Sequence, residues 1–91
     1  MATLIHEIWL CPDDQGQWLP ACLLAGPDGD AARRLLEPGS RLIHTFEAAS
    51  HFEAMTAYYR FMDFGTYTTD QAWDYQPYPE DRAQRQRGES V

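Results

Sequence analysis

The chain has 91 residues and a formal net charge of −7, and all seven of its basic residues are Arg. This length gives a single domain with a modest core and excludes a second core. An acidic chain without clustered cations is not suited to the phosphate backbone, so we expect no nucleic-acid partner. No apolar run approaches the ~18 residues of a membrane span and no signal-peptide pattern is present, which predicts a cytoplasmic protein without membrane contact.

The first two predicted elements are the arms of a hairpin. Residues 3–11 alternate apolar and polar side chains, as a strand does. Residues 12–16 carry turn residues, and residues 17–24 return as a second strand. Pro20 cannot donate to a strand ladder, which places the second strand at a sheet edge and makes the first strand central.

The two cysteines lie on the arms of this hairpin. Cys11 and Cys22 match no zinc-binding or redox spacing. In the hairpin they would not face each other, so we expect no disulfide but two buried thiols in a reducing cytoplasm.

A short helix and a third strand follow. Residues 26–30 form a loop that ends in Asp30, the predicted N-cap of a two-turn helix over residues 31–37. Pro38 and Gly39 stop this helix, and residues 41–47 have the composition of a strand.

The main helix is predicted from Ser50 to Asp63. Ser50 and Glu53 have the spacing of a capping box, and Gly65 supplies a positive-φ exit. Its apolar side chains recur at three- and four-residue steps, as in a helix that lies on a sheet. These side chains are Phe52, Met55, Tyr58 or Tyr59, and Met62.

Together these elements predict an α+β domain over residues 1–79. The order β-β-α-β-α gives a three-stranded antiparallel sheet in spatial order 2-1-3, with both helices on one face. Residues 66–69 fit either a short fourth strand or the cap of a last turn through Trp73. Residues 75–79 hold two prolines and are expected to run extended over the surface. The charged and polar residues 80–91 predict a disordered tail.

The three histidines suggest a metal site as an alternative to a purely structural role. His6 and His44 lie among apolar residues on two strands that would be adjacent, and His51 begins the main helix. Neutral imidazoles are common zinc ligands, although no further ligand is evident in the sequence. The structural interpretation is that these histidines form hydrogen bonds within the core or at its rim.

The same region permits an acid–base interpretation. The run from His44 to Glu47 is echoed by the run from His51 to Glu53, and His–carboxylate pairs are typical of proton transfer. Against this, Glu53 is used in the cap and Glu47 projects away from His44. No nucleophile or phosphate-binding motif is present, and we expect no cofactor.

The aromatic content favours a binding function. Three Trp, five Tyr and four Phe are more rings than one small core can hide, and exposed Tyr and Trp dominate binding hot spots. The sequence therefore predicts a binding domain rather than an enzyme, acting as a homodimer or with a protein partner. The alternative is a metal-binding or acid–base domain that uses His6, His44 and His51 with a nearby glutamate. The residues expected at the interaction surface are Trp9, Tyr67, Trp73, Tyr75 and Tyr78.

Overall fold

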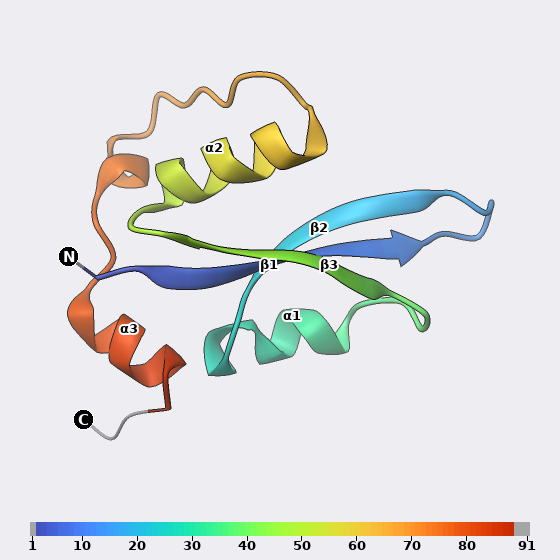
Figure 1. The fold of residues 1–91 in the computed structure, drawn as a ribbon, viewed down its shortest axis with the longest axis horizontal. Helices are drawn as coiled ribbons and strands as arrows, with labels where there is room; N and C mark the ends of the chain where they lie inside the picture. Colours follow the sequence, from blue (N-terminus) through green and yellow to red (C-terminus); the bar gives the residue numbers. More distant parts are fainter. Residues whose placement is uncertain (1, 89–91) are drawn as a thin grey trace.

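The computed structural model describes residues 2–88, which form a compact α+β domain. Three antiparallel strands, β1 (Leu4–Pro12), β2 (Trp18–Leu24) and β3 (Arg41–Ala48), lie in the order β2-β1-β3 (Figure 1). The predicted class and strand order are confirmed. Pro20 lies in the edge strand β2, as its missing N–H group required.

The strand register divides the sheet into two faces. His6 of β1 lies opposite Leu24 of β2 and Phe46 of β3, and residues opposite each other share a face. We call this the α2 face, after the helix α2 (His51–Met62), and it holds the even-numbered side chains of β1. The other face, with Ile5, Glu7 and Trp9, is the α1 face, after the helix α1 (Asp30–Arg34). Leu4 and Ile8 on the α2 face are the large apolar side chains that are fully buried among residues 2–88.

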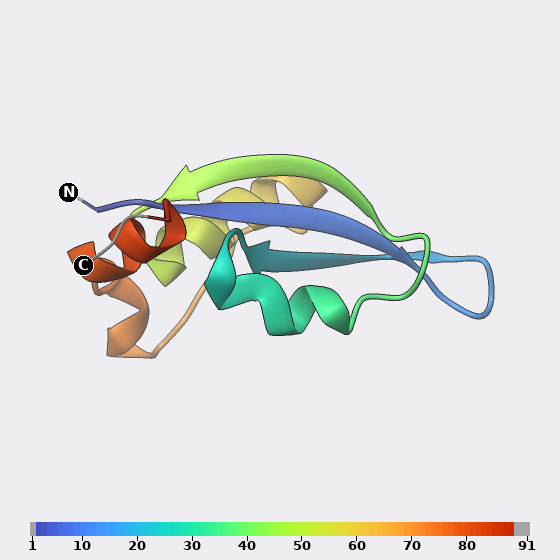
Figure 2. The same cartoon turned by 90° about the horizontal axis from the view of Figure 1, so that it is seen from below.

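The two main helices cover opposite faces of the sheet. Arg33 of α1 (Asp30–Arg34) donates to the Glu7 carboxylate at 3.0 Å, whereas Phe61 of α2 (His51–Met62) stacks on His44 at 4.2 Å. In Figure 2 α1 lies in front of the sheet and α2 behind it. The prediction that both helices share one face is wrong. Both faces of this sheet carry apolar and charged side chains, and each face needs a cover.

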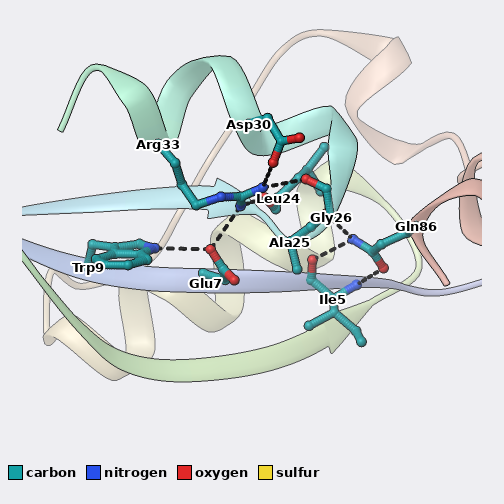
Figure 3. Close-up of polar contacts among 9 residues, drawn as sticks. All are labelled: Ile5, Glu7, Trp9, Leu24, Ala25, Gly26, Asp30, Arg33 and Gln86. Carbon is teal, nitrogen blue, oxygen red and sulfur yellow. Dashed lines mark hydrogen bonds and ion pairs between the residues drawn. The ribbon is translucent and has the colours of Figure 1, made fainter. Parts of the chain in front are cut away.

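Helix α1 is held by Arg33 and by a close backbone approach. The short 3₁₀ helix η1 (Pro27–Gly29) precedes it, so its N-cap is Gly29 rather than the predicted Asp30. A Cβ atom on Gly29 would lie 1.8 Å from the Leu24 carbonyl oxygen. The Arg33 guanidinium donates to that same oxygen at 2.7 Å, and also to the Gly26 carbonyl (Figure 3).

Helix α2 begins as predicted and ends at Met62, three residues before Gly65. The Ser50 hydroxyl accepts the Glu53 N–H at 3.1 Å, which confirms the N-cap. At the other end the left-handed residue is Asp63, with φ 60°, and the Phe64 N–H returns to the Tyr59 carbonyl at 2.9 Å. Gly65 also has a positive φ, but it follows the turn that Asp63 makes.

The segment after α2 contains a short 3₁₀ helix, η2 (Ala72–Tyr75). Residues 66–69 are not a strand. The Thr69 hydroxyl accepts the Gln71 N–H at 3.1 Å, in line with the alternative of a turn through Trp73. The extended path beyond it is confirmed, since the Tyr78 N–H donates to the Ala49 carbonyl at 2.8 Å.

The expectation of a disordered tail is wrong for residues 80–88, which include α3 (Glu80–Gln86). Ala83 is fully buried against Leu4, and the Gln86 amide binds both the N–H and the C=O of Ile5, at 2.6 and 2.8 Å. Gln86 thus continues the ladder of β1 where β2 has ended (Figure 3). The polar composition of this segment did not indicate a helix, because only one small residue, Ala83, and one amide, that of Gln86, anchor it. Residues 89–91 of the predicted tail lie outside the described residues.

Candidate functional site

Four of the five residues expected at an interaction surface gather at one end of the domain. Tyr67, Trp73, Tyr75 and Tyr78 belong to the segment that crosses from the end of α2 back to its start. Trp73 and Tyr75 are more than half exposed, and Tyr75 stacks on Phe52 of α2 at 4.6 Å. The fifth residue, Trp9, lies apart on the α1 face, where its indole N–H donates to Glu7 at 3.1 Å (Figure 3).

The buried His6 side chain contacts this segment through Tyr78. Its Nδ1 lies 3.0 Å from the Leu4 carbonyl oxygen, so Nδ1 carries the hydrogen and Nε2 accepts from the Tyr78 hydroxyl at 3.1 Å. Burial lowers the pKa of His6, and the charges of His51 and Arg82 act in the same direction. Burial also raises the pKa of Tyr78 to about 12. Both groups are therefore neutral at pH 7, as this hydrogen-bond pattern requires.

A second buried polar group, the carboxylate of Asp74, lies beside His51. Asp74 is 1% exposed, and its carboxylate accepts from the Tyr67 hydroxyl at 2.6 Å. The other carboxylate oxygen lies 3.9 Å from His51 Nε2. The bond to Asp74 raises the pKa of Tyr67, which keeps this phenol a donor. The buried Asp74 carboxylate thus lies between the Tyr67 hydroxyl and the His51 imidazole.

Between these groups lies a pocket of about 420 Å³. Its walls come from β1, the end of β2, the first turns of α2, the segment after η2, and α3. The polar side chains in its lining include His6, His51 and Arg82, and none of the Asp and Glu residues in the described part of the chain lines it. Arg82 lies over the Tyr78 ring at 5.6 Å and donates to Asp28 at 3.3 Å.

The three histidines do not converge on one site. His44 stacks between Phe46 and Phe61, with ring centroids 6.3 and 4.2 Å away, and His44 is not part of the pocket lining. In residues 2–88 no three His, Cys, Asp or Glu side chains are grouped so that they could hold a metal ion. The pocket therefore brings together His6 and His51 and leaves His44 in an aromatic stack.

The two glutamates predicted beside the histidines lie elsewhere. Glu47 pairs with Ile5 and so lies on the opposite face from His6. Glu53 is exposed in the first turn of α2. The carboxylate next to a histidine is instead Asp74, which the sequence analysis missed, as it missed Arg82. Tyr67 and His51, the groups next to the Asp74 carboxylate, lie in other parts of the chain, so no local pattern in the sequence marked Asp74.

The outer edge of β3 is the second notable surface. β3 ends the sheet on one side, and in Figure 2 no other element lies beyond it. Its first five residues are exposed, including Leu42 at 48% and Ile43 at 38%. Beside it, Phe61 of α2 is 45% exposed. We call Leu42, Ile43, Thr45 and Phe61 the β3 edge surface.

The thiols give no evidence of a nucleophile. Cys11 and Cys22 are free, in agreement with the hairpin argument, because they pair with Leu19 and Ile8 rather than with each other. Cys22 lines the pocket, and burial raises its pKa to about 11. A thiol with this pKa is protonated at pH 7 and is a poor nucleophile.

The chain matches no protein-family model, no curated protein and no solved structure. Across residues 2–88 no helix has both the length and the apolar character that a membrane crossing requires.

Proposed function

We propose that this chain is a self-associating binding domain that forms a homodimer through the β3 edge surface. The observation that carries the proposal is the balance of buried and exposed apolar side chains. Leu4 and Ile8 are the large apolar residues fully buried in residues 2–88, while ten large apolar residues are 37–84% exposed. Chains with so little buried apolar area often depend on a partner for stability.

The backbone of β3 offers an open hydrogen-bonding edge. Ile5 directs its N–H and C=O toward the β2 side, where Gln86 and Ala25 bind them. Because alternate residues of an antiparallel strand address alternate neighbours, Thr45 and Glu47, opposite Glu7 and Ile5, direct theirs outward. These unpaired groups favour strand addition.

The other edge of the sheet is blocked. Pro20 pairs with Leu10, an even-numbered residue of β1 that addresses β3, so the nitrogen of Pro20 faces outward from β2. A proline there removes one donor and its ring obstructs an incoming strand. Self-association by strand addition is therefore directed to β3.

A second copy fits the β3 edge in the antiparallel direction. β3 carries Arg41 near its start and Glu47 near its end. Antiparallel pairing brings the basic end of one copy to the acidic end of the other, whereas parallel pairing would place like charges together. It also brings the exposed Leu42 and Phe61 side chains of both copies to the interface. The Leu42 side chains would lie on the α1 face of the extended sheet and the Phe61 side chains on the α2 face. The free thiols are consistent with the predicted location in a reducing cytoplasm.

Sedimentation equilibrium of three proteins tests the dimer. The unchanged chain should sediment with twice the chain mass. Thr45→Pro removes an N–H donor from the outer edge of β3, so this variant should be monomeric or should have a dimer dissociation constant about 100-fold higher. Thr45→Val keeps the N–H and the strand propensity, so it should remain dimeric. A monomeric parent chain, or a dimer that Thr45→Pro leaves unchanged, would contradict the proposal.

A further inference from the structure

We propose that the pocket between His6, His51 and Arg82 binds a small organic carboxylate with a flat apolar body. This site is separate from the β3 edge surface and does not depend on dimer formation. Its volume of about 420 Å³ lies within the range of small-molecule sites.

The charge of the pocket selects an anion. The chain contains 14 acidic and seven basic residues, yet within residues 2–88 no Asp or Glu lines the pocket. Arg82 contributes a permanent positive charge, and the His51 imidazole adds a hydrogen-bonding group to the same lining. The carboxylate of Asp74, 1% exposed and 3.9 Å from His51 Nε2, is not part of that lining. A carboxylate ligand suits this lining, because a guanidinium can bind it through two charge-assisted hydrogen bonds.

The rest of the lining suits a flat apolar body. Leu24 and Met55 form part of the wall, and the Trp73 ring, 57% exposed and 5.6 Å from the His51 ring, stands at the rim. The neutral His6–Tyr78 pair at the floor offers a polar contact without charge. Ligand sites commonly combine such apolar walls with a few converging polar groups.

An organic cation fits the same pocket less well. Aromatic rings can bind cations on their faces, but Arg82 already occupies the face of the Tyr78 ring at 5.6 Å. Among residues 2–88 no carboxylate of the lining is available to a cationic ligand, since Asp28 and Asp74 lie outside the lining and are bound by Arg82 and Tyr67.

Phenylacetate, its neutral analogue phenylacetamide and the cation benzyltrimethylammonium test the inference in an amide-resolved NMR titration. Phenylacetate should shift signals of residues around the pocket, with a dissociation constant of about 1 mM or below, and bind about tenfold more tightly than phenylacetamide. Equal binding of the amide, tighter binding of the cation, or no shift with phenylacetate at about 20 mM would overturn the proposal.

A matched pair of variants tests whether the Arg82 guanidinium produces the preference for a carboxylate ligand. Arg82 and Arg85 both bind Asp28, at 3.3 and 3.1 Å, but Arg85 is not in the pocket lining. Arg82→Met should abolish the tenfold preference for phenylacetate over phenylacetamide, whereas Arg85→Met should keep it. Loss of the preference in both variants, or in neither, would contradict a role for Arg82. Far-UV circular dichroism and melting curves of both variants serve as the control that each variant is folded.

Discussion

The two ends of the domain differ in how their side chains are satisfied. At the end where α3, η2 and the start of α2 meet, buried polar groups have partners, as His6 has Tyr78 and Asp74 has Tyr67. Along the β3 edge surface, Leu42 and Ile43 are exposed, and within residues 2–88 no strand pairs with the outer side of β3. This contrast supports the proposal that the first end is complete within one chain, whereas a second copy completes the β3 edge.

The largest expected effect away from the β3 edge surface is at Gly29, the last residue of η1. A Cβ atom there would meet the Leu24 carbonyl at 1.8 Å, so Gly29→Ala must displace α1 and should cost about 2–3 kcal/mol of unfolding free energy. Gly16 is the control, because it has φ +79° but open space around it, and Gly16→Ala should cost about 1 kcal/mol. Urea unfolding measures both, and equal losses would argue against tight packing at Leu24.

A smaller loss is expected at Gln86. Gln86→Ala leaves the Ile5 N–H without its partner and should cost about 1–2 kcal/mol in urea unfolding. Gln86→Glu should also destabilise the domain, because a carboxylate cannot donate to the Ile5 and Ala25 carbonyls. Full stability of both variants would mean that α3 does not anchor on the edge of β1.

The smallest effect is a pH dependence that originates at His6. Its pKa is lowered in the folded state, chiefly by burial, so the unfolded chain binds the proton more readily. The stability from neutral His6 is complete above pH 6.5, the ordinary pKa, and is lost as pH falls through the folded pKa. His6→Gln should flatten the dependence of the melting temperature on pH just below pH 6.5. A parent chain without this slope would contradict the assignment.

The sequence predicted the features that depend on local patterns. Alternation identified the three strands, Pro20 assigned the edge, and the spacing of Ser50 and Glu53 located the start of α2. The face covered by α1 could not be predicted in this way, because it depends on a contact between Arg33 and Glu7 that are 26 residues apart.

The candidate site was predictable only in part. Composition indicated that the rings had a role, but the meeting of His6 with Tyr78 spans 72 residues and depends on the path of the last segment. α3 was missed because Gln86 binds backbone atoms of a distant strand, a role that local polarity does not reveal. Asp74 is buried among aromatic neighbours, against the usual exposure of a carboxylate.

Residue-resolved amide hydrogen exchange tests the β3 dimer most directly, because adjacent amides provide the control. The Phe46 N–H addresses β1 within the chain, whereas the Thr45 N–H addresses the outer edge. If the dimer forms through β3, the Thr45 amide should exchange about as slowly as the Phe46 amide at concentrations where the dimer is populated, and should exchange faster on dilution. Fast exchange at Thr45 beside slow exchange at Phe46, at every concentration, would contradict pairing through β3.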